Sequence, residues 1–449
     1  MELRRSIQKD IEQWYKSGGK SALLIKGARQ VGKTHIIRKV LSELQADYIE
    51  INLIQTPAAI GIFEKAETIE EIMVGLSVFS TKPLVKGKTV VFIDEVQKYK
   101  EMVTKIKFLV EEGSFRYVLS GSLLGVELTN LESAPVGYLT PREMYPLTFE
   151  EFLQITNISD DIKSYLIQCL KERKPVLEEV NRKMLALYNQ YLIVGGMPEA
   201  VSAFAASYNV NEVLAIHDSI IKLYKLVFTQ YENDSNKLIL TNIYDLIPAE
   251  LLKQNRRFIV SDIKKGLHYE RVASSFLWLK NAGVALPVYN ATEPVVPLKI
   301  NEKQSLFKLY LSDVGMLTSI YGMNTKTRLL NGDVHLTAGG IFENAVVSEL
   351  VDLGYHVYYY NNNRLGELDC VIEYDGNILP IEVKSGKDYY IHSALTHCVE
   401  NENYEIKEAI VFANCNVHKE GKVVYLPVYM VTFLNKNNAQ ELVADRIEF

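Results

Sequence analysis

The sequence has few cysteines, no long apolar run and no excess of positive charge, and each of these absences excludes a class of protein. Its 449 residues include four cysteines, none in a Cys-x-x-Cys spacing, which predicts reduced structural thiols in a cytoplasmic protein rather than a disulfide framework or a zinc site. The absence of any uncharged apolar run of about 18 residues predicts no membrane partner. The formal net charge of −6 means that nucleic-acid binding would require a local basic surface.

What the chain does have is length and apolar content: 48% of its residues are hydrophobic, and a chain of this size is expected to form roughly three domains. Changes in pattern predict four regions. They are an α/β domain with a parallel sheet at 1–150, a helical region at 151–235, short helices followed by strands at 236–335, and an α/β region at 336–449.

The first region alternates between short apolar runs and segments of helical periodicity, the pattern of a three-layer α/β domain with a mostly parallel sheet. Buried strands are predicted at residues 21–25, 48–53, 89–94 and 117–121. Helices are predicted at residues 3–16, 34–44, 58–79 and 100–112.

A glycine-rich loop of the form GxxxxGK[ST] follows the first predicted strand and precedes a predicted helix. Its residues are Gly27, Ala28, Arg29, Gln30, Val31, Gly32, Lys33 and Thr34, and His35 follows them at the start of the helix. In this context successive backbone N–H groups cradle phosphates at a helix N-terminus. Lys33 is expected to reach the β- and γ-phosphates and Thr34 to bind Mg²⁺. The loop therefore predicts ATP and Mg²⁺ as cofactors, with Gly27 to His35 contacting the nucleotide.

The third predicted strand ends in two acids, Asp94 and Glu95. Asp94 is expected to support Mg²⁺, and Glu95 is placed to activate the attacking water as general base. The fourth strand ends in Ser120, Gly121 and Ser122. A polar side chain there, with Ser120 as the candidate, is either a sensor of the γ-phosphate or part of a plain turn. A transition-state arginine is also expected. The candidates, which the sequence does not separate, are Arg29, Arg116, Arg142 or an arginine from a second copy in a homo-oligomer.

Motifs along essentially the whole chain together resemble the prokaryotic AAA-type ATPases that carry an uncharacterised C-terminal region. These motifs are Gly27–Thr34 (GARQVGKT), Phe92–Gln97 (FIDEVQ), Leu119–Ser122 (LSGS), Tyr145–Leu153 (YPLTFEEFL), Tyr191–Glu199 (YLIVGGMPE), Leu309–Leu317 (LYLSDVGML) and Ile381–Gly386 (IEVKSG). The resemblance implies an AAA-type ATPase domain over 1–150 and a winged-helix unit within 236–335. The chain departs from the family pattern at Gly137-Tyr138, where the family has Gly-Arg, and Arg142 is the available substitute.

The segment 250–282 carries seven basic side chains and three acidic ones in an otherwise acidic chain. A basic helix-turn-helix of this kind would contact DNA phosphates. The alternative is a solvated surface on a domain that packs against the ATPase. The basic residues are Lys253, Arg256, Arg257, Lys264, Lys265, Arg271 and Lys280.

Three acids and a lysine stand out near the C-terminus. Asp369 and Glu382 lie on two strands that a hairpin would place side by side, and alternation puts Glu382 and Lys384 on the same strand face. This spacing resembles the D-x(n)-ExK phosphodiesterases of the restriction-endonuclease-like fold. That resemblance implies Asp369 and Glu382 as metal ligands, Lys384 as catalytic, and Glu343 as an additional ligand from the preceding helix. The alternative is a surface hairpin with paired charges.

Two hypotheses follow. In the first, the chain is an ATPase that couples ATP binding and hydrolysis to a DNA-acting C-terminal module, a metal-dependent nuclease. In the second, the nucleotide switches binding to a protein partner or self-assembly, and the C-terminal domain keeps a nuclease-like fold without cleaving.

Overall fold

The computed structural model divides into two compact units. The N-terminal unit comprises residues 1–147 and 274–284, and the C-terminal unit comprises residues 148–273 and 285–449. The residues that the structure describes are 3–18, 21–80, 82–122, 137–231, 234–332, 338–362 and 365–434. Within these ranges, no helix is both long enough and apolar enough to cross a bilayer.

The N-terminal unit is built on a five-stranded sheet with the strand order β2-β3-β4-β1-β5. Its strands are β1 (Ala22–Lys26), β2 (Tyr48–Asn52), β3 (Val90–Asp94), β4 (Arg116–Gly121) and β5 (Leu139–Glu143). All neighbouring strands are parallel, which confirms the predicted α/β class. The short, partly exposed β5 was not predicted. Because the strands are parallel, their carboxyl ends meet at one edge, where ligands bind in folds of this class.

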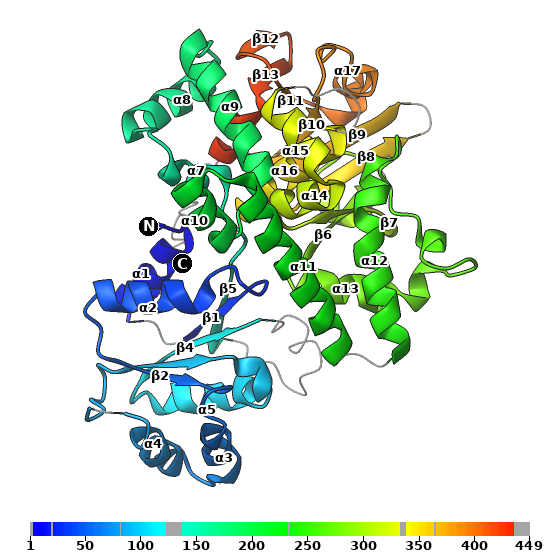
Figure 1. Cartoon of the computed structure of the whole chain (residues 1–449). Helices are drawn as coiled ribbons and strands as arrows, with labels where there is room; N and C mark the ends of the chain where they lie inside the picture. Colours follow the sequence, from blue (N-terminus) through cyan, green and yellow to red (C-terminus); the bar gives the residue numbers. More distant parts are fainter. Residues whose placement is uncertain are drawn as a thin grey trace, which may run out of the picture. The chain divides into compact units, whose positions relative to one another are not determined.

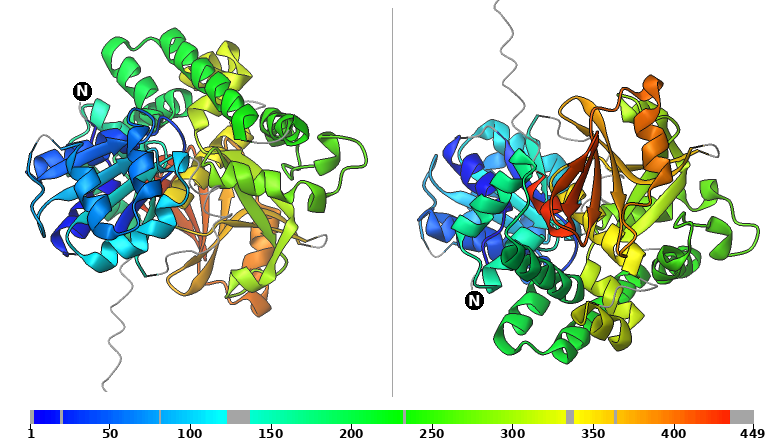
Figure 2. Two further views of the ribbon diagram at one scale, coloured as in Figure 1. Left: turned by 90° about the horizontal axis from the view of Figure 1, so that it is seen from below. Right: turned by 90° about the horizontal axis from the view of Figure 1, so that it is seen from above.

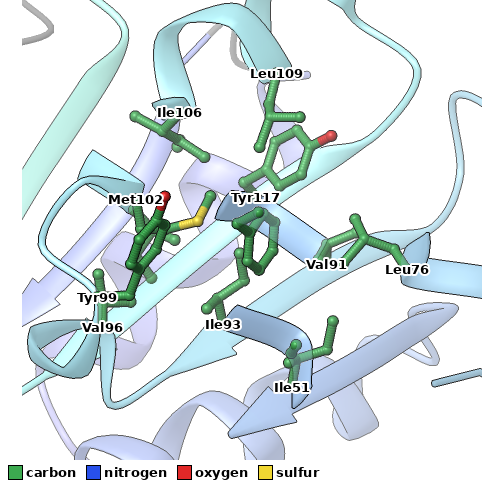
Figure 3. Close-up of a cluster of buried hydrophobic side chains, with 14 of the residues drawn as sticks. Ile51, Leu76, Val91, Ile93, Val96, Tyr99, Met102, Ile106, Leu109 and Tyr117 are labelled. Atoms are coloured by element: carbon green, nitrogen blue, oxygen red, sulfur yellow. The ribbon is translucent and has the colours of Figure 1, made fainter. Parts of the chain in front are cut away.

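Helices cover both faces of this sheet, with α1 and α2 on one side and α5 on the other (Figure 1). The helices of the unit are α1 (Ile7–Lys16), α2 (Lys33–Glu43), α3 (Ala58–Lys65), α4 (Ile69–Ser77), α5 (Met102–Glu112) and α13 (Ala273–Asn281). Figure 3 shows the apolar core in which α4 and α5 pack against β2, β3 and β4.

The helical periodicity over residues 58–79 corresponds to two helices in the structure, α3 and α4. Ala66 takes an extended backbone conformation that ends α3. Thr68 then caps α4, its side chain accepting a hydrogen bond from the backbone N–H of Glu71. A capping threonine with acids in the following turn is a helix start signal, so the break could have been found in the sequence.

The C-terminal unit contains a mixed eight-stranded sheet with the order β12-β13-β11-β10-β9-β8-β6-β7. Its strands are β6 (Ala285–Ala291), β7 (Glu302–Leu311), β8 (Tyr358–Asn362), β9 (Gly366–Tyr374), β10 (Asn377–Val383), β11 (Ala409–Ala413), β12 (His418–Glu420) and β13 (Val423–Pro427). Strand β6, which would supply the wing of the expected winged helix, is part of this sheet because it pairs with β7 and with β8. A separate winged helix is therefore not confirmed. The predicted boundary at 335/336 lies outside the described residues.

Helices of the C-terminal unit pack on this sheet and on one another. They are α7 (Phe149–Phe152), α8 (Asp160–Glu172), α9 (Glu178–Val194), α10 (Pro198–Ser207), α11 (Val210–Tyr231), α12 (Asp234–Leu252), α14 (Val314–Tyr321), α15 (Met323–Leu330), α16 (Ala338–Asp352) and α17 (Ser393–Glu400). Helix α16 packs against β7 and β10, whereas α17, the orange helix in Figure 2, packs against β9 and β10. All four cysteines are buried and unpaired.

Candidate nucleotide site and buried carboxylate cluster

The predicted phosphate loop connects strand β1, which lies between β4 and β5 in the sheet, to the N-terminus of α2. Two of its glycines are required by geometry. At Gly27 a Cβ atom would lie 2.1 Å from the backbone oxygen of Met144, and Gly32, immediately before α2, has a left-handed φ of 95°. Left-handed backbone favours glycine because it lacks a Cβ. The loop therefore presents backbone N–H groups at a helix N-terminus, an arrangement suited to binding phosphate.

Lys33 lies folded over this loop. Its Nζ donates hydrogen bonds to the backbone oxygens of Gly27 at 3.0 Å and Ala28 at 2.7 Å. Burial lowers the pKa of Lys33 to about 8, although the nearby carboxylates of Glu95 and Asp94 act in the opposite direction. The lysine is thus a buried donor held at the loop by contacts that phosphate oxygens would replace.

The two residues expected to hold Mg²⁺ are brought together by different elements. The Oγ1 atom of Thr34, at the start of α2, donates to Oδ2 of Asp94, at the end of β3, at 2.9 Å. The Nδ2 atom of Asn52 donates to the same oxygen at 3.1 Å, and the hydroxyl of Ser120 donates to Oδ1 of Asp94. This set of hydroxyl and carboxylate oxygens beside the phosphate loop fits Mg²⁺, which prefers oxygen ligands. Ser120 thus supports the Asp94 carboxylate, and its role as a sensor of the γ-phosphate stays a prediction.

Glu95 has a left-handed backbone, with φ 59° and ψ 41°. This conformation is costly for a residue with a side chain and is typical of functional sites. The amide of Gln97 donates to the Glu95 carboxylate and to Oγ of Ser122 at 3.3 Å. Sequence reasoning did not single out Gln97 or Asn52. Each lies within a quoted motif or a predicted strand, but only the fold shows what it contacts.

Replacing Gln97 by leucine is expected to lower kcat for ATP hydrolysis by about tenfold while leaving KM for ATP nearly unchanged. The reason is that leucine cannot orient the Glu95 carboxylate, and positioning is part of what a general base contributes. Steady-state phosphate release checks this. An unchanged kcat, or a loss confined to KM, would contradict a positioning role for Gln97.

The three candidate arginines occupy different places. Arg116 begins β4, so it lies at the edge of the sheet opposite the phosphate loop, and it donates to the backbone oxygen of Tyr15 at 2.5 Å. Arg142 forms an ion pair with Asp10, with 2.7 Å between Nε and Oδ1. Arg29 belongs to the phosphate loop itself. Of these three, Arg29 is best placed to contact phosphate from within the same chain.

The segment 274–284, which overlaps the C-terminal end of the predicted helix-turn-helix at 250–282, belongs to the N-terminal unit. It contains most of α13 and ends in a turn at Gly283 with φ 74°. A Cβ atom at Gly283 would lie 2.8 Å from the backbone nitrogen of Ala28. The turn therefore lies directly against the phosphate loop, a contact for which the sequence gives no signal.

Changing Gly283 to alanine is expected to weaken ATP binding by about tenfold, because the new methyl group would displace a loop nitrogen. A left-handed alanine itself costs about 1–2 kcal/mol. The matched control is Gly87→Ala, because Gly87 has φ 75° and no described atom lies within 4 Å of the place that its Cβ would take. Calorimetric titration with a non-hydrolysable ATP analogue measures both variants. Equal affinities in the two would show that the contact does not matter for binding.

The segment with many basic side chains has fewer free charges than its sequence indicates. Lys253 forms ion pairs with Glu250 at 2.6 Å and Asp262 at 2.7 Å. Arg256 forms an ion pair with Glu343, whereas Lys264 and Lys265 are exposed. The surface available to DNA phosphates is therefore smaller than the local charge predicts.

The expected hairpin is present in the C-terminal unit. Strands β9 and β10 pair antiparallel, with Cys370 opposite Ile381. The backbone N–H of Val383 donates to Oδ2 of Asp369 at 2.9 Å, and Lys384 forms an ion pair with Glu382 at 2.8 Å. The charged residues of the motif thus converge at one end of the hairpin.

Glu343, on α16, faces this cluster but is already bound by cations. Lys308 donates to its Oε1 at 2.8 Å, and Arg256 and the Tyr310 hydroxyl also donate to its carboxylate. Although burial acts in the opposite direction, Arg256 and Lys308 lower the pKa of Glu343 to about 2. Burial, Glu343 and Glu382 raise the pKa of Asp369 well above its usual value.

These residues do not fit a divalent metal ion as the structure arranges them. Among the described residues, no group of three or more His, Cys, Asp or Glu side chains is positioned to hold one. Sequence reasoning missed Lys308. It could have been noticed as the charged residue within the otherwise apolar strand segment Leu306–Leu311. The metal-ligand roles of Asp369, Glu382 and Glu343 and the catalytic role of Lys384 stay predictions.

Comparisons with known proteins agree with the α/β fold of the N-terminal unit. Residues 19–153 match the family model of the AAA domain, so this part of the chain carries a P-loop ATPase fold. Residues 185–327 and 338–430 match two domains of unknown function, DUF8612 and DUF4143. The search of curated proteins gave no match.

Several solved structures are similar to this chain at low identity. The Walker-type ATPase of Pyrococcus abyssi is 14% identical with a TM-score of 0.42, and the match covers 71% of this chain and 96% of that one. The Aeropyrum pernix ORC1 protein, solved in complex with DNA, is 14% identical over 74% of this chain and 95% of its own, with a TM-score of 0.28. The RuvB branch migration motor of Thermotoga maritima is 13% identical over 68% and 92%, with a TM-score of 0.30.

Proposed function

We propose that the chain is a Mg²⁺-dependent ATPase whose hydrolytic site consists of Lys33, Thr34, Asp94 and Glu95. The observation that carries this proposal is the 2.9 Å hydrogen bond between Thr34 and Asp94 directly beside the phosphate loop. The AAA-domain match over residues 19–153 supports it.

Each of these side chains has a separate task. Lys33 exchanges its loop carbonyl partners for phosphate oxygens and neutralises their charge. Thr34 and Asp94 would hold Mg²⁺, which supplies charge neutralisation at the β- and γ-phosphate oxygens. Glu95 accepts a proton from the attacking water, while Gln97 orients its carboxylate.

Phosphate release from ATP by the purified full-length chain tests the proposal. We expect turnover with Mg²⁺, none in excess EDTA, and recovery when Mg²⁺ is restored. Turnover that persists in EDTA, or no turnover together with no ATP binding, would refute it.

The C-terminal unit is the proposed target of the ATP cycle. The contact between Gly283 and the phosphate loop supports coupling, because the chain continues from that turn directly into β6. The first candidate partner is DNA, bound through exposed residues such as Lys264-Lys265, and cleavage by the Asp369 motif is the corresponding nuclease hypothesis. The second candidate is a protein partner or a homo-oligomer, which the few unpaired basic residues favour.

One comparison separates these candidates. If DNA is the partner, single- or double-stranded DNA raises the ATPase rate, and Lys264→Glu/Lys265→Glu abolishes the increase. If the nucleotide controls self-assembly, the rate per chain rises with protein concentration and DNA has no effect. In that case an arginine of a neighbouring copy is the expected transition-state group.

A further inference from the structure

The carboxylate cluster consists of Glu343, Glu367, Asp369 and Glu382. We propose that Lys308 and Arg256 are the permanent counter-cations of this cluster, and that the resulting ion-pair network excludes divalent metal ions. The residues concerned all belong to the C-terminal unit. The inference goes beyond the proposed ATPase function and does not depend on it.

Lys308 lies at the centre of the network. Its side chain is 0% exposed, and its Nζ atom is 2.8 Å from Glu343, 2.8 Å from Glu367 and 3.8 Å from Asp369. An ammonium group has three donors and no acceptor, so three surrounding carboxylates match its bonding capacity. A lysine with no exposed surface cannot swing into solvent to make room for another cation without local opening of the fold.

Arg256 closes the network from a second side. Its Nη1 atom contacts Glu343 and lies 3.5 Å from Oδ1 of Asp369. The fold makes room for this guanidinium at Gly339, where a Cβ atom would lie 2.4 Å from Nη2 of Arg256. Both oxygens of Glu343 are therefore bonded to cations, Oε1 to Lys308 and Oε2 to Arg256.

The remaining acids offer few free oxygens. Asp369 accepts from the Val383 N–H through Oδ2 and faces both cations through Oδ1. Glu382 has Lys384 on Oε1, while its Oε2 is buried without a hydrogen-bond partner in the described part of the chain. A divalent ion needs several oxygens at about 2.0–2.6 Å, and here it would also meet the positive charge of Lys308 and Arg256 in a medium of low polarity. One available oxygen beside two fixed cations does not form such a site.

The cluster becomes a latent metal site if its central cation is removed. In Lys308→Met the three carboxylates lose their shared ammonium and regain oxygens that can bind a metal ion. We expect this variant to bind one Mn²⁺ ion that the native chain does not bind, and we expect its Tm without metal to fall by roughly 5–10 °C. Millimolar Mn²⁺ should restore part of that loss.

The measurement is Mn²⁺ binding by electron paramagnetic resonance, together with thermal unfolding, on the nucleotide-free full chain. Lys303→Met is the matched control, because Lys303 lies on the same strand and is exposed; it should bind no additional Mn²⁺. Adding Asp369→Asn to Lys308→Met should abolish the gained site.

Two results would overturn the proposal. The first is Mn²⁺ binding by the native chain that disappears in Asp369→Asn, and this comparison remains decisive even if Lys308→Met fails to fold. The second is a folded Lys308→Met variant that gains no Mn²⁺ site. ATP hydrolysis, measured in parallel, reports on the proposed function separately.

Discussion

Replacing Glu95 by glutamine is expected to lower kcat for ATP hydrolysis by at least about 100-fold, because a positioned general base contributes roughly 10²–10⁴-fold. Glutamine has nearly the same shape as glutamate but cannot accept the proton of the attacking water. The contacts that hold the nucleotide, made by Lys33 and the phosphate loop, are untouched. The affinity for ATP should therefore change only a few-fold, and the variant should accumulate in the ATP-bound state.

Single-turnover hydrolysis together with titration of a fluorescent ATP analogue separates the two effects. Glu101→Gln is the control, because Glu101 is exposed just before α5 and a short way along the chain from the site. If Glu95→Gln hydrolyses ATP within threefold of the native rate, Glu95 is not the base. If the affinity of Glu95→Gln for ATP also falls steeply, Glu95 has a structural role.

Lys33→Met is expected to weaken ATP binding by about 100-fold, because hydrogen bonds between charged groups contribute roughly 1.5–3 kcal/mol each. The native chain should also lose affinity as the pH rises. Lys33 has a pKa of about 8 in the nucleotide-free chain, lowered by burial, and phosphate favours its protonated form. Affinity is therefore complete below pH 8 and declines above it, by at most about tenfold per pH unit.

Calorimetric titration between pH 7 and 9 measures this dependence. The Lys33→Met variant should show a flat profile over the same range, since its methionine does not titrate. Lys65→Met, at an exposed position on α3, should follow the native curve. A native affinity that is constant from pH 7 to 9 would mean that Lys33 is not the titrating group.

The placement of the proposed nucleotide site could be predicted because its residues lie in short motifs. The phosphate loop needs glycines at fixed offsets, and the acids of β3 follow an apolar run, so the positions of Lys33, Thr34 and Asp94 in the fold could be predicted from local sequence. The contact between Thr34 and Asp94 follows from parallel strands ending at a common edge. Even here the hydrogen bond from the Ser120 hydroxyl to Asp94 could not be predicted, because it depends on side-chain packing.

The rest could not be predicted because it depends on pairings between distant segments. Strand β6 resembles a wing in the sequence but joins the C-terminal sheet through β8. Lys308 and Arg256 are separated from Glu343 by 35 and 87 residues, and nothing local marks them as its partners. A motif such as Asp369 to Lys384 specifies ligands but not the cations that the fold brings to them.

The return of residues 274–284 to the N-terminal unit has a consequence for biosynthesis. The phosphate loop leaves the ribosome early, yet the turn at Gly283 that lies against it is made only after α7–α12 have been translated. At a synthesis rate of about 5–20 residues per second, residues 274–284 are made on the order of ten seconds after residues 1–147. During that interval a nascent chain holds an incomplete nucleotide site, and a chain truncated near residue 150 would never complete it.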